Sequence, residues 1–176
     1  MSSRSFSVVA RLVFVVTLTL SLASVAPDAL AKTAYLKVDL VKVDKSSRTM
    51  YLLKGDKVVK KYHIALGRNT RGHKVREGDR RTPEGEYVLD YVKEDSAFHR
   101  AMHISYPNAE DIARAKTKGV SPGGFIMIHG QKNGDKRDPR RRQRLNWTNG
   151  CIALTNAEMD EFLSLVETGT KIRIQW

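Results

Sequence analysis

One cysteine and one histidine are the residues best suited to covalent chemistry here. Cys151 is the only cysteine among 176 residues, so it is a buried inert residue, a partner in an intermolecular disulfide, or a reactive thiol. His129 ends a short apolar run, residues 125–128. The thiolate is the nucleophilic form of cysteine, and a neighbouring imidazole can take the proton of the thiol. The pair therefore predicts nucleophilic acyl transfer through a thiolate–imidazolium ion pair, with a thiol pKa below its usual value.

The neighbours of both residues fit such a role. Gly150 precedes Cys151 and leaves the backbone uncrowded, so the N–H groups of Gly150 and Cys151 are predicted oxyanion donors. The second ring nitrogen of His129 needs a partner that fixes the tautomer, and the Gly130 carbonyl is the predicted one. Taken without further context, His129 is equally consistent with a structural histidine.

Four further residues are predicted to contact a ligand in the same cleft: Thr148, Asn149, Tyr106 and His103. Thr148 can instead be a local cap, because threonine before a turn commonly bonds to nearby backbone. His99 and His103 have the i, i+4 spacing of metal ligands on a helix. Their segment is predicted to be extended and lacks the metalloprotease glutamate, so no metal and no other cofactor is predicted.

The elements that must position these residues form a β-rich α+β domain. Strand patterns occupy residues 35–43, 49–53, 58–66, 87–92, 125–128 and 171–176, and Gly55-Asp56 joins the second and third of them as a hairpin. Asn108 and Thr155 are predicted to cap two short helices, with Gly119 and Gly169 beyond their ends. Residues 67–81 carry six Arg or Lys and one apolar residue, Val75, which predicts a mobile, solvated loop.

The N-terminal residues and the net charge indicate an exported protein with anionic partners. Residues 1–31 combine Arg4 and Arg11, an uncharged apolar run over residues 12–26 and an Ala-Leu-Ala cleavage pattern, as in a secretory signal peptide. The alternative is an uncleaved anchor, but 15 apolar residues fall short of the about 20 that span a bilayer. Residues 32–176 are then the mature domain, with no stable membrane insertion and a predicted periplasmic location. The chain carries 31 Lys and Arg against 19 Asp and Glu, a net charge of +12; outside the cytoplasm this favours cell-envelope polymers over nucleic acid.

The sequence resembles the L,D-transpeptidase catalytic domain, or YkuD-type, family. The resemblance rests on His129-Gly130, on the later Thr148-Asn149-Gly150-Cys151-Ile152, on Thr82-Pro83-Glu84-Gly85-Glu86-Tyr87 and on Gly169-Thr170 before the last strand pattern, and it spans residues 35–175. It implies a single-domain mixed β-sandwich with two short helices and a cleft that holds Cys and His. It further implies Cys151 as the acylated nucleophile, His129 as the base, Gly130 as its orienting carbonyl, and peptidoglycan stem peptides containing diaminopimelate as substrates.

Two positions depart from the general pattern of this family. Ala153 stands where the family has an arginine expected to hold a substrate carboxylate, and Asn149 stands where it usually has a histidine. The runs at residues 147–156 and 103–108 look like a proteobacterial branch that includes a murein amidase, which detaches a lipoprotein from diaminopimelate. The alternatives are therefore a transpeptidase, a hydrolase with the same acyl-enzyme, and a non-catalytic peptidoglycan-binding module. An envelope lipoprotein is a further expected partner.

A basic run over residues 136–144 contains five arginines and one lysine. It is interpreted as a solvated charged loop, as such runs usually are. The functional alternative is a collar that attracts anionic stem peptides. Nucleic acid binding is not expected, because aromatic residues for base stacking are missing from the run.

Overall fold

A computed structural model describes residues 37–176 of the chain, and the predicted signal peptide lies outside these residues. The elements are β1 (Leu40–Asp44), β2 (Thr49–Lys54), β3 (Lys57–His63), β4 (Gly85–Ser96), β5 (His99–Ile104), α2 (Ala109–Thr117), β6 (Met127–His129), α3 (Pro139–Gln143), β7 (Ile152–Ala153), α4 (Asn156–Leu165) and β8 (Lys171–Gln175). Between residues 37 and 176, no helix has both the length and the apolar character needed to cross a membrane.

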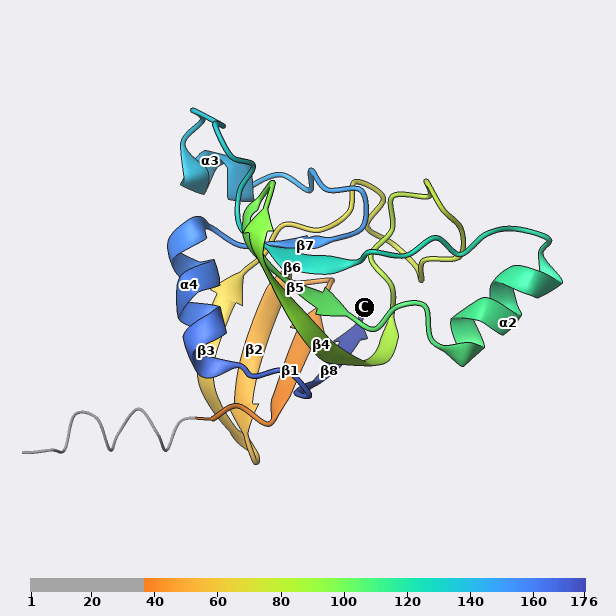
Figure 1. Ribbon diagram of the computed structural model, residues 1–176, viewed down its shortest axis with the longest axis horizontal. Helices are drawn as coiled ribbons and strands as arrows, with labels where there is room; N and C mark the ends of the chain where they lie inside the picture. The colour runs from red at the N-terminus through yellow and green to blue at the C-terminus, as the bar shows by residue number, and fades with distance from the viewer. Residues whose placement is uncertain (1–36) are drawn as a thin grey trace, which may run out of the picture.

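The eight strands form one mixed sheet in the order β3-β2-β1-β8-β4-β5-β6-β7. The strand β4 is long enough to serve two neighbours: residues 85–88 pair with β8, and residues 89–96 pair with β5. Register irregularities accompany the second pairing, and Figure 1 shows β4 sweeping from one half of the sheet into the other. Such irregularities bend a strand and increase its twist, so the sheet folds back on itself.

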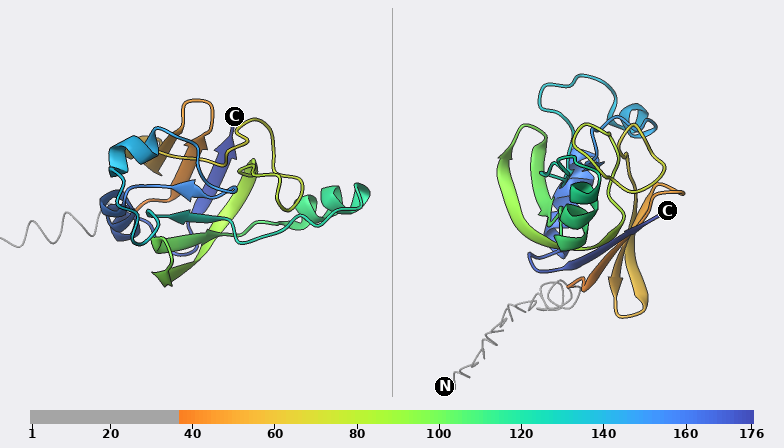
Figure 2. Two further views of the ribbon diagram at one scale, coloured as in Figure 1. Left: turned by 90° about the horizontal axis from the view of Figure 1, so that it is seen from above. Right: turned by 90° about the vertical axis from the view of Figure 1, so that its right-hand side faces the viewer.

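The core lies between the two halves of this sheet. Val41 and Leu52 from one half, Ile128 and Ile152 from the other, and Phe162 of α4 belong to a single cluster of buried side chains. The two further views of the ribbon show the halves facing each other, while α2 projects away from the body (Figure 2). The predicted β-rich mixed sandwich is therefore confirmed.

Local sequence signals explain most of these elements. Gly55 adopts a positive φ of 55° in the β2–β3 turn, which glycine tolerates without a Cβ clash. The predicted capping boxes are both present, Asn108 with Asp111 at α2 and Thr155 with Glu158 at α4. Each box satisfies backbone N–H groups that a helix start leaves without partners.

Two expectations about local structure were wrong, and one strand was not predicted. The basic run contains a third helix, α3, which begins after Asp138 with proline in its first turn. The loop over residues 67–81 is anchored rather than simply solvated, because Lys74 is buried and its Nζ lies 3.1 Å from Asp79. The two-residue strand β7 carried no sequence pattern of its own; it pairs with β6 and sits directly after Cys151.

Candidate active site

Two adjacent parallel strands bring Cys151 and His129 together. In the β6–β7 register, Ile128 lies opposite Ile152 and His129 lies opposite Ala153. Extending this register by one residue puts Cys151 opposite Met127. Because side chains alternate along a strand, Cys151 and His129 fall on the same face. Both residues line one cleft of about 880 Å³.

His129 is held in a single orientation. Its Nδ1 lies 2.6 Å from the Gly130 carbonyl oxygen, which confirms the predicted hydrogen bond and leaves Nε2 as the proton acceptor of the neutral ring. Phe98 packs at 4.6 Å and Trp147 at 5.6 Å between ring centroids. Only 3% of the residue is exposed, and this burial lowers the pKa of His129 to about 4. The imidazole is therefore neutral at pH 7 and able to act as a base.

The surroundings of Cys151 favour the neutral thiol. Its Sγ donates to the Phe125 carbonyl oxygen at 3.7 Å, and burial raises its pKa, partly offset by a backbone hydrogen bond from Met127 and by the charge of Lys74. The predicted thiolate–imidazolium pair with a lowered thiol pKa was wrong, since burial penalises both charged forms. The arrangement is a neutral thiol beside a neutral base.

The turn before Cys151 is built around Thr148. The Thr148 hydroxyl donates to the Cys151 carbonyl oxygen at 2.7 Å and accepts the Gly150 N–H at 3.1 Å. The Gly150 N–H is thus occupied, so its prediction as an oxyanion donor was wrong. Gly150 itself has a φ of 132°, and an added Cβ would lie 2.7 Å from the Arg81 carbonyl oxygen; both facts require glycine here.

Two clefts of different chemistry meet at Cys151. The larger one, with His129, is lined by Phe98 and Trp147 among others. The second has a volume of about 540 Å³ and is mainly polar and basic; its side chains come from residues 68–80 and from residues 123–126. Four residues line both clefts: Arg68, Phe125, Asn149 and Cys151. Asn149 accepts a hydrogen bond from Arg68 Nη1 at 3.2 Å, so the predicted ligand contact at Asn149 lies at the boundary.

Part of the basic run faces the larger cleft. Arg137 and Arg142 both line it, and the Arg142 guanidinium lies 4.4 Å from the centre of the Trp147 ring. Asp135 is paired with Arg137 at 2.5 Å. Gln143 fixes α3 to the site by donating to the Ala153 carbonyl oxygen at 2.7 Å. Arg137 and Arg142 therefore fit the alternative of a basic collar around the cleft. Arg140, Arg141 and Arg144 are exposed, as expected for a solvated charged loop.

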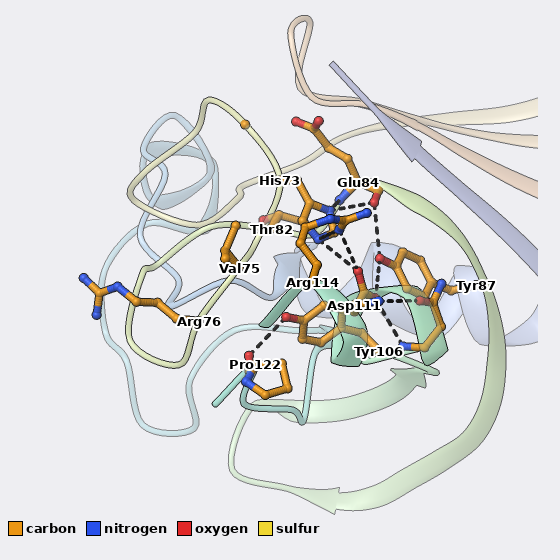
Figure 3. Close-up of polar contacts among 12 residues, drawn as sticks. His73, Val75, Arg76, Thr82, Glu84, Tyr87, Tyr106, Asp111, Arg114 and Pro122 are labelled. Carbon is orange, nitrogen blue, oxygen red and sulfur yellow. Dashed lines mark hydrogen bonds and ion pairs between the residues drawn. The ribbon is translucent and has the colours of Figure 1, made fainter. Parts of the chain in front are cut away.

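Tyr106 and His103 do not lie at Cys151; neither lines either cleft beside it. Tyr106 is 2% exposed and donates to the Pro122 carbonyl oxygen at 3.1 Å, within a buried cluster that Figure 3 shows around Asp111. His103 stacks on Tyr91 at 4.6 Å, and its Nδ1 lies 2.7 Å from Asp90. Both positions in the fold are structural, so the expectation that they wall the cleft was wrong.

His99 also has a carboxylate partner: its Nε2 lies 2.9 Å from both oxygens of Asp160. Within residues 37–176, no group of three or more His, Cys, Asp or Glu side chains is arranged to hold a metal ion. The i, i+4 spacing of His99 and His103 falls on the strand β5, where it places each histidine beside a different acidic residue.

Sequence reasoning missed several residues that border Cys151. Phe125 is 80% exposed and has a positive φ of 55°, and nothing in the sequence separates it from the apolar run that follows. Phe98, Arg68 and Arg142 reach the site from distant segments, so their proximity depends on the whole fold. Trp147 is largely buried and also lines the larger cleft.

Comparison with known proteins agrees with this geometry. The family model of the L,D-transpeptidase catalytic domain matches residues 39–174. YafK of Escherichia coli (strain K12), whose assignment as an L,D-transpeptidase is provisional, is 30% identical over 132 residues, which are 72% of this chain and 46% of YafK. The chain thus spans about half the length of the curated relatives it matches.

Two solved structures illustrate the similarity. The helical cell shape determining protein Pgp2 of Campylobacter jejuni superposes with a TM-score of 0.60 at 26% identity, covering 78% of this chain and 47% of Pgp2. An L,D-transpeptidase of Enterococcus faecium gives a TM-score of 0.52 at 17% identity, covering 80% and 50%, and it supports the fold. From the family match over most of its length, this chain belongs to the L,D-transpeptidase catalytic domain family.

Proposed function

We propose that this protein is a cysteine-dependent acyl-transfer enzyme that acts on peptidoglycan stem peptides in the periplasm. The observation that carries the proposal is the shared cleft of Cys151 and His129, with His129 Nδ1 fixed by the Gly130 carbonyl oxygen at 2.6 Å. A binding module requires neither a thiol nor an oriented base at this place. The family, which acts on peptidoglycan stem peptides, supplies the substrate class.

The proposed reaction begins from neutral groups. As Cys151 Sγ attacks the amide carbonyl carbon, His129 Nε2 takes the thiol proton, so that charge develops only during the reaction. The Cys151 N–H is the proposed donor to the oxyanion, since the Gly150 N–H is already bonded to Thr148. The imidazolium then gives its proton to the departing amine as the C–N bond breaks, which leaves a thioester on Cys151. An incoming amine or water resolves the thioester.

A synthetic stem peptide containing diaminopimelate, analysed by mass spectrometry with purified protein, tests this mechanism. Cys151→Ala and His129→Ala should each reduce turnover by at least 1,000-fold, and the double variant should be scarcely slower than either, because residues acting as one unit are not additive. Substantial turnover by Cys151→Ala would show that the nucleophile lies elsewhere. His103→Gln is a suitable control, because His103 lies outside both clefts.

Hydrolysis is the second candidate outcome, and Ala153 is the observation that favours it. Its side chain is fully buried beside Ala65 and Trp147, so it offers no charge to hold the carboxylate of an acceptor. A charge-assisted hydrogen bond contributes about 1.5–3 kcal/mol, roughly 10- to 150-fold in occupancy. Assaying crosslinked and lipoprotein-linked peptidoglycan with and without an added D-amino acid distinguishes the outcomes. Amine-exchanged products alone, with no hydrolysed stem in the absence of amine, would identify a transpeptidase.

A further inference from the structure

The basic loop over residues 67–82 forms a fixed wall beside the nucleophile. Lys45, whose side chain is fully buried, donates from Nζ to the carbonyl oxygens of Gly72 and Thr82 at 2.9 Å and pairs with Glu84 at 2.8 Å. The loop has almost no apolar side chains to pack into the core. It is held instead by the hydrogen bonds and the ion pair of Lys45.

A second set of contacts holds the tip of the loop. The Asp79 carboxylate accepts hydrogen bonds from the N–H groups of Val75, Arg76 and Arg81, at 2.7 to 3.1 Å, and pairs with Lys74. These bonds lower the pKa of Asp79 despite its burial, so this carboxylate stays ionised. A loop constrained at so many points keeps its outward side chains in fixed places.

A third anchor joins the loop to α2 (Figure 3). His73 contacts the Glu84 backbone on one side, and its Nε2 lies 2.9 Å from Asp111 on the other. Tyr87 donates to the same Asp111 at 3.0 Å. Close backbone packing completes the wall next to Cys151, because a Cβ at Gly67 would lie 2.2 Å from the Arg80 carbonyl oxygen and 3.2 Å from the Gly150 Cα.

Two of the positive charges on this wall have no carboxylate partner in the part of the chain that the structure describes. Arg68, Lys74 and Arg80 line the smaller cleft, with Glu77 as the one acidic residue among its lining side chains. Lys74 is paired with Asp79, whereas Arg68 and Arg80 have no carboxylate within 4.0 Å anywhere in residues 37–176. Two uncompensated guanidinium groups thus face one carboxylate, and the cleft beside the thiol has a net positive charge.

Arg80 also has an unusual backbone. Its φ is 58°, a left-handed conformation that is strained for a residue other than glycine. Phe125, which also lines this cleft, shares this conformation with a φ of 55°. Strained residues persist where the surrounding structure fixes them, and they concentrate at ligand-binding sites.

We infer that the smaller cleft is a carboxylate-binding subsite in which Arg68 and Arg80 hold a carboxylate of the substrate next to the amide or amine that reacts at Cys151. Arginine is suited to this because its planar guanidinium binds carboxylate through two parallel hydrogen bonds. The inference rests on the proposed acyl transfer and adds the group that would replace the missing charge at Ala153. The carboxylate of Glu77, which lines the same cleft, repels a bound carboxylate and should weaken its binding.

The test measures kcat and KM for one stem tetrapeptide containing diaminopimelate and for two derivatives of it. In one derivative the free carboxylate of diaminopimelate is converted to the carboxamide, and in the other the C-terminal carboxylate is converted. Arg68→Gln and Arg80→Gln should each raise KM about 10- to 100-fold for the parent peptide, with a much smaller effect for the derivative that lacks the bound carboxylate. If the substitutions raise KM for only one of the two derivatives, the carboxylate missing from the other derivative is the one that Arg68 and Arg80 bind. Glu77→Gln should act in the opposite direction and lower KM.

Arg76→Gln is the matched control, because it removes the same charge from the same loop. Arg76 is absent from the lining of the cleft, and Figure 3 shows its side chain pointing away from the anchoring cluster. It should change KM by less than twofold. Equal effects of Arg68→Gln, Arg80→Gln and Arg76→Gln on all three peptides would overturn the subsite in favour of a general effect of net charge.

Acyl-enzyme formation without an acceptor separates the two possible sources of the carboxylate. If the donor peptide supplies it, the variants slow formation of the Cys151 adduct; if the acceptor supplies it, they slow only the second step. Failure of the proposed function would look different, since wild type would then form no adduct with any peptide. The subsite alone would be refuted if the wild-type protein turned over every peptide and the arginine variants changed KM equally for all of them. The proposed function would then still stand.

Discussion

Desolvation favours the neutral forms of both Cys151 and His129. A thiol whose pKa is raised by burial resists oxidation and non-specific alkylation, because only the thiolate reacts readily. The neutral imidazole, with a pKa of about 4, remains a proton acceptor over the whole neutral range. In the proposed mechanism, the thiol of Cys151 therefore gives up its proton to His129 only when a peptide carbonyl is in place.

Burial of His129 also makes folding stability depend on pH. The unfolded chain has a histidine pKa of about 6.5, and the folded pKa is about 4, so between these values the unfolded state binds more protons. Stability therefore falls as pH decreases from 6.5 to 4, by up to about 3 kcal/mol. Urea unfolding of wild type and His129→Gln at pH 7.0 and 4.5 should show the larger loss in wild type. Equal losses in the two proteins would contradict this assignment.

Replacing Phe125 with glycine should increase the stability of the protein and lower its activity. Its positive φ stores strain, and its exposed ring forgoes burial, so Phe125→Gly should raise the free energy of unfolding by about 0.5–1 kcal/mol after the entropic cost of glycine. The same change removes an aromatic wall from both clefts and should lower kcat/KM for stem peptides. Phe125→Ala is the control, because it keeps the strain while removing the ring. A Phe125→Gly protein no more stable than Phe125→Ala would argue against stored strain.

At the scale of elements, the basic loop depends on an anchor beyond its own sequence. Lys45→Met should cost about 3 kcal/mol, since it leaves Glu84 and two carbonyl groups without their buried partner. The added substitution Glu84→Gln should recover part of this loss by removing the unpaired charge. Lys42→Met, on β1, is the control for loss of one positive charge. Limited proteolysis should cut residues 67–81 faster in Lys45→Met alone, and unchanged cleavage would show that the loop is held by other contacts.

Elements with local signals were predictable, and those held by long-range contacts were not. The hairpin at Gly55 and the capping boxes at Asn108 and Thr155 involve residues close in sequence, so the pattern contained the information. The helix α3 depends on Gln143 reaching the carbonyl of Ala153, and β7 exists only as a partner of β6. The prediction that residues 67–81 are mobile was wrong, because the contact that holds them comes from Lys45. This residue lies 27 positions before Gly72, and nothing in the sequence pattern indicates the contact.

The same distinction explains the candidate site. Cys151 and His129 stand beside strand ends with glycine neighbours, so the sequence could predict that the two residues share one site. The direction of their pKa values was not readable, because it results from the packing of Phe98 and Trp147 and from burial of the thiol. Tyr106 and His103 lie close in sequence to the site's supporting strands, but their side chains face other clusters.

For the whole molecule, β8 connects the N-terminal strands to β4, the strand that continues into the other half of the sheet. It pairs in parallel with β1 and antiparallel with β4, and its Ile172 is 1% exposed in the common core. Ile172→Ala should destabilise the protein by about 2–5 kcal/mol and should do so cooperatively. Far-ultraviolet circular dichroism and tryptophan fluorescence should give one coincident transition, as expected for a single cooperative unit. Separate transitions would show that the half-sheets unfold independently. Gln175→Ala, an exposed change on the same strand, is the control.

The central position of β8 has a consequence for the order of folding. Its partner β1 lies about 130 residues earlier in the chain, so during synthesis the first hairpin waits with an unpaired edge until nearly all the other elements have emerged from the ribosome. Contacts between such distant segments form slowly because a long loop must close first. An exposed strand edge is also where chains pair with one another. The edge of β1 therefore stays open until β8, the last of the described strands, pairs with it and completes that half of the sheet.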